Sequence, residues 1–538
     1  MKRFNIYLPL LFSTFLALGL YFGYRIGFRA ATGDENTIFA PAQAGGKLDN
    51  ILQFIEQDYV DTVNSSQLEN NAINGMLEKL DPHSQYITAD EFHEMNDPLL
   101  GSFEGIGVSF RIEKDTITVI NPVKGGPSEK VGIMAGDRIV IIDDSLVAGV
   151  KVTNRDAMRK LKGKKGTKVN VKVYRHGVEG LIPFAITRDV IPTYSLDVSY
   201  MIDKQTGYIR LNKFAATTYD EFVEAAEKLL DADMKTLILD LRGNTGGYLK
   251  AATEISDEFL SKGKLIVYTQ GKNRPKSFSF ANRDGLLEEV ELIVLIDEGS
   301  ASASEIVAGA IQDNDRGTII GRRSFGKGLV QEQMSMRDGS ALRLTVARYY
   351  TPTGRSIQKP YDGDFEKYHH ESYERYENGE MMSADSIHQT DTVKYLTPGG
   401  KIVYGGGGIT PDVYVALERD SSLYFFNRLT NSGLIFQYAF DYADSKRSEL
   451  LRFKDVKAFQ NGFNMTDAML AELYKLADDK GISKPAIVST ESRRHIKTLF
   501  KAYVARNILD DAGFYPVYQE IDPILLKAIS HSKSTAKN

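Results

Sequence analysis

The chain contains no cysteine among its 538 residues. This absence excludes a thiol nucleophile, a disulfide and a thiolate metal site. It does not fix the compartment, although a chain without cysteine is compatible with an oxidising cell envelope. An excess of basic charge is also lacking, because the net charge is −5 and both signs are mixed along the chain. We therefore expect no nucleic-acid partner, and we interpret the basic run at 160–172 as a solvated surface.

Long hydrophobic runs are confined to the extreme N-terminus. Basic residues precede an apolar run from about 4 to 22, which approaches the roughly 20 residues needed to span a bilayer. We interpret 1–28 as a signal anchor or signal peptide. A retained anchor is favoured, because no clean small-x-small cleavage site follows the run. By the positive-inside rule, the basic start lies in the cytoplasm and the residues after the apolar run lie outside it. Arg25 and Arg29, which follow the run, weaken this prediction of orientation.

The remaining residues divide by pattern, and the length suggests three or four domains. Residues 46–98 show apolar positions at helical spacing. Residues 101–188 contain short strand-like runs with one helix between them, which predicts a small β-rich module. From 190 to 420 strand-like and helical runs alternate, which predicts an α/β core with a largely parallel sheet. A polar excursion at about 361–395 interrupts this core, and a mostly helical region at 421–538 completes an α/β multidomain fold.

The densest candidate site lies in the α/β core. A buried strand ends at Ile296, a Gly/Ser turn follows, and a helix begins near Ser302. Loops at the C-terminal ends of parallel strands are where such folds place chemistry. Ser302 and Glu305 fit a capping box, so a helix cap and a nucleophile are both open. The two roles are compatible, because a helix N-terminus also favours developing negative charge.

A nucleophilic serine needs a base, and histidine is not the evident one here. None of the eight histidines lies in this segment, although distance in sequence does not exclude His83. No GxSxG elbow surrounds the serines. Lysine serves as a base if desolvation lowers its pKa toward neutrality. The apolar neighbours of Lys327 would bury its amine, and a solvated loop lysine is the open alternative.

Lys327 also permits a different interpretation. Residues 321–327 match the first seven positions of a phosphate-binding P-loop. The eighth position is Gly328, where serine or threonine should bind magnesium, and the following residues look like strands rather than the required helix. A nucleotide hydrolase is therefore disfavoured. The GxG at Gly105 gives almost no support to a dinucleotide site.

A second glycine-rich turn occurs at 240–247, after the strand-like run TLILDL. One interpretation is a tight strand-to-helix turn. The other is a turn that aims backbone N–H groups at an oxyanion. The sequence leaves both open.

Several blocks together resemble the carboxy-terminal processing (tail-specific) serine peptidases. SASASE, QD and SFGKGLVQ resemble the signature of that family, and other blocks follow in its usual order. These blocks span about 72 to 416. The resemblance implies a helical N-terminal part, a PDZ domain and an α/β peptidase core. The other blocks are LDPHSQY, GSFEGIGV, DLRGNTGG, YYTPTGRSIQ and GITPDV.

The resemblance also implies roles for single residues. Ser302, the middle serine of SASAS, would be the nucleophile, and Lys327, 25 residues later, the general base. Gln331 matches the glutamine that positions the lysine. Lys327, Leu329 and Gln331 would share one face of a strand, so this role is geometrically possible. Asp313 matches an aspartate implicated in some members, with either a supporting or a structural role.

Backbone groups receive roles by the same resemblance. The N–H groups of Gly246 and Ala303 would be the oxyanion donors. The loop before the first PDZ strand would bind a terminal carboxylate, and the strand would pair with an extended peptide. The loop residues are Gly105, Ile106, Gly107 and Val108.

The sequence thus predicts a serine endopeptidase with a Ser–Lys dyad on the periplasmic side of the inner membrane, anchored there, or exported if the signal is cleaved. Its expected substrates are envelope proteins or peptides with exposed C-terminal tails, which the PDZ domain would recruit or admit to the site. The N-terminal segment would contact the membrane, and a homo-oligomer is an open expectation. No cofactor or metal is expected. The alternative is a non-catalytic PDZ scaffold or chaperone of the cell envelope, against which the intact Ser302–Lys327–Gln331 set argues.

Overall fold

The computed structural model contains two compact units, residues 1–76 and 77–538. The first unit carries α2 (Lys47–Asp58) and all but the last residue of α3 (Ser65–Leu77). The second unit carries the sheets and the helices from α4 onward. The residues that the structure describes are 13–21, 46–387, 393–417 and 421–535.

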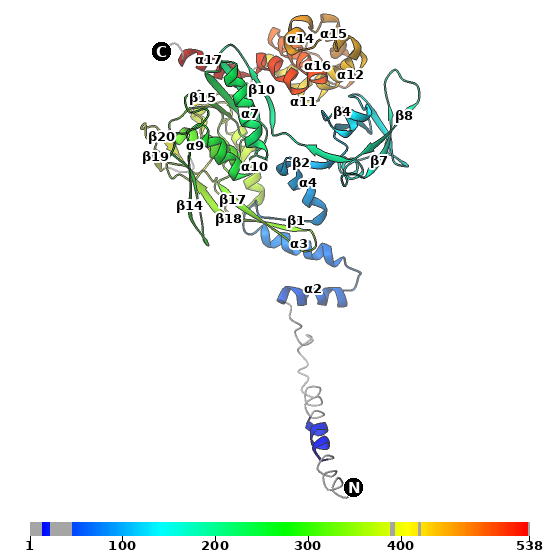
Figure 1. Ribbon diagram of the computed structural model, residues 1–538, viewed down its shortest axis with the longest axis vertical. Helices are drawn as coiled ribbons and strands as arrows, with labels where there is room; N and C mark the ends of the chain where they lie inside the picture. Colours follow the sequence, from blue (N-terminus) through cyan, green and yellow to red (C-terminus); the bar gives the residue numbers. More distant parts are fainter. Residues whose placement is uncertain (1–12, 22–45, 388–392, 418–420, 536–538) are drawn as a thin grey trace. The chain divides into compact units, whose positions relative to one another are not determined.

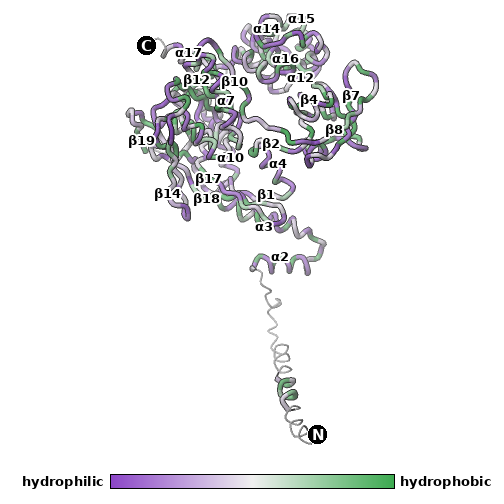
Figure 2. Tube along the Cα trace, in the orientation of Figure 1, coloured by the Kyte–Doolittle hydropathy of each residue, from purple (hydrophilic) through white to green (hydrophobic). Residues whose placement is uncertain are grey.

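The predicted membrane anchor at 1–28 lies mostly outside the described residues. Its described part, residues 13–21, is helical and largely hydrophobic (Figure 2). Within the described ranges, no helix is both long and apolar enough to cross a membrane. The anchor stays a prediction.

The predicted helical region at 46–98 is interrupted by one short strand. Besides α2 and α3 it contains α4 (Ala89–Leu100), but β1 (Gln85–Ile87) precedes α4. This strand pairs antiparallel with β18 (Ala341–Tyr350) of the peptidase core. Helical spacing does not reveal such a strand, because its partner lies far away in the sequence.

The β-rich module at 101–188 has the expected strands and helix. Its sheet has the order β3-β4-β5-β7-β8, so β3 has one strand neighbour and forms an edge. In β7 the valines alternate inward, as a period of two requires. The elements are β2 (Ser102–Gly105), β3 (Val108–Glu113), β4 (Thr116–Pro122), α5 (Pro127–Val131), β5 (Arg138–Ile142), β6 (Ser145–Leu146), α6 (Asn154–Leu161), β7 (Lys168–Tyr174), β8 (Leu181–Thr187) and β9 (Asp189–Pro192).

The central sheet of the core is parallel from its second strand onward, as predicted. Its order is β10-β11-β12-β15-β16-β21, and only β10 pairs antiparallel. Every residue of β12 is buried, which fits a strand covered on both faces. The strands are β10 (Leu196–Met201), β11 (Thr206–Leu211), β12 (Thr236–Asp240), β15 (Glu291–Ile296), β16 (Thr318–Gly321) and β21 (Val413–Tyr414).

Helices cover both faces of this sheet (Figure 1). Leu237 and Leu239 point toward a cluster formed with α7 (Thr218–Asp231), α8 (Leu249–Asp257) and α9 (Ala303–Asp313). Ile238, between them, points to the opposite face, where α17 (Pro523–Thr535) packs. The core is therefore a three-layer α/β structure, and α9 begins at the carboxyl end of β15. The residues of α17 in the second cluster are Ile524, Leu525, Ala528 and Ile529.

A second sheet lies beside the central one and carries the segment after Lys327. β18 is at its centre, with β17 on one side and β1 and β13 on the other. The excursion at 361–395, expected to be an inserted polar segment, contains α10, a short 3-10 helix (Ala384–Ser386) and the start of a hairpin. The elements are β13 (Leu265–Gly271), β14 (Arg274–Phe280), β17 (Leu329–Ser335), α10 (Phe365–Glu377), β19 (Lys394–Leu396) and β20 (Ile402–Tyr404).

The C-terminal region is mostly helical, as predicted. Its helices enclose a hydrophobic cluster rich in aromatic side chains. The longest helix, α16, is kinked at Asp510, which has φ 54°. The elements are α11 (Tyr424–Asn431), α12 (Leu434–Ser445), α13 (Arg447–Leu450), α14 (Val456–Gly462), α15 (Asp467–Asp479) and α16 (Thr490–Tyr518).

Candidate active site

Ser302 lies at the N-terminus of α9, at the carboxyl end of the central sheet. Its backbone has φ 55° and ψ −112°, a region that residues other than glycine rarely adopt. Such a conformation costs on the order of 1–3 kcal/mol and persists only where the surrounding structure enforces it. The Ser302 N–H donates to Glu305 Oε2 at 2.8 Å, so this arm of the predicted capping box is present. The cap is therefore present, and the nucleophilic role of Ser302 stays a prediction that is compatible with it.

Burial distinguishes Ser302 from the two serines that flank it. Ser300 and Ser304 are fully buried. Their hydroxyls donate to the carbonyl oxygens of Leu241 and Asn244, each at 2.8 Å. Ser302 is partly exposed. Of the three, Ser302 is therefore the serine that a substrate can reach.

The glycine-rich turn at 240–247 packs directly against Ser302. Gly246 has φ +103°, and a Cβ there would lie 2.7 Å from Ser302 Cβ, so a side chain does not fit. The Gly246 N–H donates to Asn244 Oδ1 at 2.9 Å and is thus engaged within the turn. Ala303 is the first residue of α9, where the helix dipole favours negative charge. Both oxyanion roles stay predictions.

Lys327 is partly buried, and its environment favours the neutral amine. Burial is the main cause that lowers the Lys327 pKa below its ordinary value. The positive charge of Arg343 lowers it further, while Asp81 and Glu305 oppose the change without reversing it. A lysine in such a setting accepts a proton nearer neutrality than a solvated one does. The structure therefore shows a partly buried lysine rather than a solvated loop lysine, and the role of Lys327 as a base stays a prediction.

Gln331 holds the Lys327 amine in one direction. Lys327 Nζ donates to Gln331 Oε1 at 3.1 Å. The Gln331 side-chain nitrogen in turn donates to the backbone carbonyl of His83. We expected this contact to arise from simple alternation along a strand, and the structure differs. Lys327 precedes β17, and the register shifts between Val330 and Gln331.

A buried carboxylate, Glu305, joins the segments that carry Ser302 and Lys327. Glu305 Oε2 accepts the N–H groups of both residues at 2.8 Å. Its Oε1 accepts the Ser324 hydroxyl at 2.6 Å and the Gly326 N–H at 2.7 Å. Burial raises the pKa of Glu305, while the four donors favour its charged form. One side chain of α9 thus fixes the backbone of both candidate residues.

Tyr349, on β18, reinforces this connection. Its hydroxyl lies 3.0 Å from the carbonyl oxygen of Ser302 and 2.6 Å from that of Lys327. Across the described residues, no hydrogen bond joins Ser302 Oγ to Lys327 Nζ, and the amine is bonded to Gln331 instead. Catalytic hydrogen bonds are often long without substrate and tighten in the complex.

Sequence reasoning missed the Asp-Pro-His-Ser turn as part of this site. Asp81 Oδ1 accepts the N–H groups of His83 at 2.8 Å and Ser84 at 2.9 Å, an Asx-type turn. The Ser84 hydroxyl accepts the Thr345 N–H at 3.1 Å, which attaches the turn to β18. Burial and the positive charge of Lys327 lower the pKa of His83 to about 3, so its imidazole is neutral. The local sequence signals the turn but not its partners.

Asp313 lies at the far end of α9 from Ser302. An α-helix of this length separates the two by roughly 15 Å. The Asp313 carboxylate is buried, pairs with Arg355 at 2.7 Å and accepts the Thr353 hydroxyl at 2.6 Å. It therefore fixes the YYTPTGRSIQ turn, which is the structural alternative left open for it.

The P-loop interpretation is wrong. A strand, β17, follows Lys327 where a phosphate-binding helix is required.

Among the residues that the structure describes, no group of three or more His, Cys, Asp or Glu side chains is placed to hold a metal ion.

The predicted tail-binding loop borders a cavity of about 310 Å³. The carbonyl oxygens of Ile106 and Gly107 accept the N–H groups of Ser128 at 3.1 Å and Val123 at 2.9 Å. In a trans peptide the N–H points opposite to the carbonyl. The N–H groups of Gly107 and Val108 therefore point away from these internal partners.

The lining of this cavity is mostly apolar, with two lysines and two carboxylates, Glu94 and Asp97, among its charged residues. Lys162 Nζ pairs with Asp97 of α4 at 2.9 Å. Lys213 belongs to the peptidase core, so the cavity is bordered by both the module and the core. The apolar lining residues are Phe103, Ile106, Val108, Phe110, Met158 and Leu161.

Comparisons with known families match four segments of the chain. Peptidase family S41 matches residues 205–366, and the PDZ domain family matches 105–182. The N-terminal domain of the activating protease CtpB matches 29–91, and a family of unknown function matches 425–510.

Individual relatives carry matching names. The carboxy-terminal-processing protease of Bartonella bacilliformis is 40% identical over 330 residues, covering 60% of this chain and 74% of the relative. Carboxy-terminal processing protease CtpA of Bacillus subtilis is 36% identical over 331 residues, covering 61% and 68%. The solved photosystem II D1 C-terminal processing protease aligns with a TM-score of 0.35 and 25% identity, covering 69% of this chain and 88% of that one. On the strength of the sequence relatives, the chain belongs to the PDZ-containing carboxy-terminal processing proteases of Peptidase family S41.

Proposed function

We propose that this protein is a serine endopeptidase in which Ser302 is the nucleophile and Lys327 the general base. The observation that carries the proposal is Glu305, whose carboxylate accepts the backbone N–H groups of both residues. Family membership supports a serine peptidase. A non-catalytic PDZ scaffold has no evident use for a strained, accessible serine beside a buried lysine.

The proposed reaction uses one proton carrier. The neutral Lys327 amine takes the Ser302 hydroxyl proton as Oγ attacks the scissile carbonyl. The Ala303 N–H, at the helix N-terminus, would stabilise the oxyanion. When the C–N bond breaks, the Lys327 ammonium returns the proton to the leaving amine and an acyl-enzyme remains. Water then attacks the ester while Lys327 accepts its proton and gives it to Ser302 Oγ as that oxygen leaves.

We further propose that the PDZ module selects substrates by their C-terminal tails. Three observations support this role. The N–H groups of Gly107 and Val108 point away from the module's internal hydrogen bonds. The following strand, β3, is an edge that can pair with an extended peptide. The lining is mostly apolar, and Lys213 can attract a carboxylate there, whereas Lys162 is already paired with Asp97. Apolar tails with a free terminus should therefore bind best.

Lys213 offers a route by which a bound tail would gate the site. It precedes Phe214, whose N–H donates to the Gly246 carbonyl at 2.9 Å and whose carbonyl accepts the Tyr248 N–H at 2.8 Å. Gly246 in turn packs on Ser302. If the terminal carboxylate of a bound tail is attracted to Lys213, it would shift the backbone at Phe214. Phe214 is hydrogen-bonded to the glycine-rich turn that packs against Ser302.

The test is cleavage of one unstructured protein that bears a free apolar, a charged or an amidated tail. We expect the wild type to cleave the apolar tail fastest, and folded Ser302→Ala to cleave none. Deletion of 101–188 should alter this selection or the basal rate. Cleavage by Ser302→Ala would contradict the nucleophile. Equal rates for all tails, in intact and deleted enzyme, would show that the module does not read tails.

We propose that the enzyme works on the periplasmic side of the inner membrane. The supporting observation is the apolar run at about 4–22 behind a basic start. Fractionation with alkaline extraction, and N-terminal sequencing of the mature protein, would test this. Recovery in the cytosol with an intact N-terminus would contradict export.

A further inference from the structure

Helix α10, in the polar excursion, contacts the back of the candidate active site. The S41 match ends at residue 366, just inside this helix. Tyr368 of α10 is only 4% exposed. Its hydroxyl oxygen lies 2.9 Å from His83 Nε2, and the two rings meet edge to face with centroids 5.3 Å apart. The excursion therefore contacts the Asp-Pro-His-Ser turn, whose His83 carbonyl accepts the Gln331 side-chain N–H.

Gln358 fixes the direction of the hydrogen bond between Tyr368 and His83. Gln358 Nε2 donates to the Tyr368 hydroxyl oxygen at 3.3 Å, which leaves the hydroxyl hydrogen for His83. His83 Nε2 is then the acceptor, and the ring is neutral, in agreement with its lowered pKa of about 3. The hydrogen bond therefore persists over the pH range in which a lysine base works.

His83 transmits this restraint to the base through its backbone. Its carbonyl accepts the Gln331 side-chain N–H, and Gln331 Oε1 accepts from Lys327 Nζ at 3.1 Å. Because the amide nitrogen is occupied, Gln331 presents its oxygen to the lysine. A flipped amide would present N–H groups instead, and these would compete for the lone pair that the base needs.

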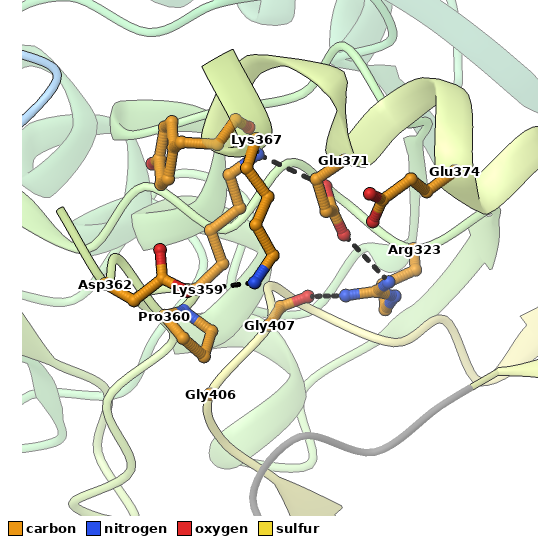
Figure 3. A pocket seen from close by; sticks show the side chains of 10 residues that line it. Arg323, Lys359, Pro360, Asp362, Lys367, Glu371, Glu374, Gly406 and Gly407 are labelled. Carbon is orange, nitrogen blue, oxygen red and sulfur yellow. Dashed lines mark hydrogen bonds and ion pairs between the residues drawn. The ribbon is translucent and has the colours of Figure 1, made fainter. Parts of the chain in front are cut away.

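The same helix is also connected, through Lys359, to the loop that carries Lys327. Lys359 Nζ lies 4.1 Å from the ring centroids of Phe325 and Tyr368. It donates to the Tyr368 carbonyl at 3.0 Å and pairs with Glu371 at 3.2 Å. Figure 3 shows Lys359, Glu371 and Arg323 turned toward one another at a small pocket of about 160 Å³. Helix α10 is therefore built into the site rather than loosely attached to it.

We propose that Tyr368 and His83 are positioning residues for Lys327, and that α10 is consequently part of the catalytic apparatus of this enzyme. Neither side chain touches Ser302 in the contacts described above. They act through Gln331, which orients the amine. This inference rests on the proposed Ser302–Lys327 chemistry and adds to it a helix that lies almost wholly outside the family match.

The first test is Tyr368→Phe in the full chain, which removes one hydroxyl and keeps the buried ring. We expect kcat to fall about three- to tenfold with KM unchanged, because one hydrogen bond that acts on the base is lost. Tyr373→Phe is the matched control, since Tyr373 is on the same helix and is 59% exposed. It should keep wild-type kinetics. Wild-type kcat in Tyr368→Phe, or a change in KM alone, would overturn the proposal.

The second test is a double-mutant cycle with Gln331→Ala. If Tyr368 acts through Gln331, then Tyr368→Phe should cost nothing further once Gln331 is removed. Equal, additive losses in both backgrounds would show a merely structural role and overturn the proposal. His83→Phe enters the cycle in place of Tyr368→Phe if the latter lowers the melting temperature. If only the positioning role of Tyr368 and His83 is wrong, Ser302→Ala is still inactive. If the proposed Ser302–Lys327 chemistry is itself wrong, Ser302→Ala still cleaves the substrate.

Discussion

Two lysines belong to or contact the loop at 324–328, and their surroundings differ: Lys327, partly buried, lies in the loop, and Lys359, buried, packs against it. Lys359 Nζ pairs with the Glu371 carboxylate, lies against two aromatic rings and donates to a backbone carbonyl. Lys327 Nζ donates to the neutral amide of Gln331, and within the described residues it forms no ion pair. Burial lowers the pKa of both lysines, but Glu371 opposes the change at Lys359 through direct contact. Lys359 therefore has a carboxylate in direct contact, and Lys327 has only the more distant charges of Asp81 and Glu305.

This difference separates a structural lysine from a base. A compensated ammonium keeps its proton and stabilises the fold that surrounds it. A buried ammonium without such a partner loses its proton more easily, which favours a general base and opposes folding. The comparison therefore predicts opposite outcomes for the same substitution at Lys327 and Lys359.

The largest expected effect is on turnover. Lys327→Ala should reduce kcat by about 10⁴-fold or more, because a nucleophile and its base act as one unit. Lys359→Ala should reduce kcat by less than about tenfold, since it disturbs only the packing of the loop. Steady-state cleavage of an unstructured substrate by both folded variants is the measurement. Comparable losses of kcat in the two variants would contradict the assignment of Lys327 as the base and Lys359 as a structural lysine.

The next effect is on stability at Lys359. Lys359→Met should lower the free energy of unfolding by about 1–3 kcal/mol, because Glu371 loses one of its buried partners. Glu371 keeps Arg323 at 3.3 Å, which limits the loss. Denaturant unfolding at pH 7 measures it, with Lys367→Met as the control at an exposed ion pair. An unchanged midpoint would show that the Lys359 pair contributes nothing.

Lys327→Met should do the reverse and stabilise the protein by about 1 kcal/mol at neutral pH. The folded-state pKa of Lys327 lies below its unfolded value, so the unfolded chain binds more protons between the two values. Wild-type stability therefore rises with pH across that window. The advantage of Lys327→Met should shrink accordingly as the pH approaches 10.5. Unfolding curves at several pH values test the sign, and a destabilised variant at neutral pH would contradict it.

A smaller effect is expected at Arg343, whose positive charge helps to lower the Lys327 pKa. Arg343→Gln should move the rising limb of kcat/KM to higher pH, by less than about one unit. Arg343→Lys keeps the charge and should leave the limb nearly in place. A limb that moves equally in both variants would point to lost packing rather than to charge.

Most of the fold could be predicted from the sequence because hydrophobic runs and helical spacing are local patterns. Strands such as TLILD are continuous hydrophobic runs between helical segments, and this pattern predicts a parallel sheet directly. Ser302 and Lys327 were identified because they lie in motif blocks that resemble the family. The choice of Ser302 over its neighbours rested on that resemblance, and the structure adds that Ser300 and Ser304 are buried and bonded to the backbone.

The parts of the site that were missed are long-range contacts. Gln331 meets the His83 carbonyl from 248 residues away, and Tyr368 meets His83 from 285 residues away. No periodicity encodes such pairs. Glu305 was interpreted as a capping residue, and it does cap Ser302. Its three further donors come from the loop at 324–327, which local reasoning cannot place.

The most direct measurement of the central claim is the pH dependence of kcat/KM for the wild type, with an unstructured substrate that has a free apolar tail. Because kcat/KM reports the free enzyme, its rising limb reports the pKa of the essential base. Burial lowers the Lys327 pKa, and the proposed mechanism uses the neutral amine, so the rate should rise with pH through a single limb clearly below 10.5. A limb at the ordinary lysine value, or a profile that does not change with pH, would contradict a buried lysine base at Lys327.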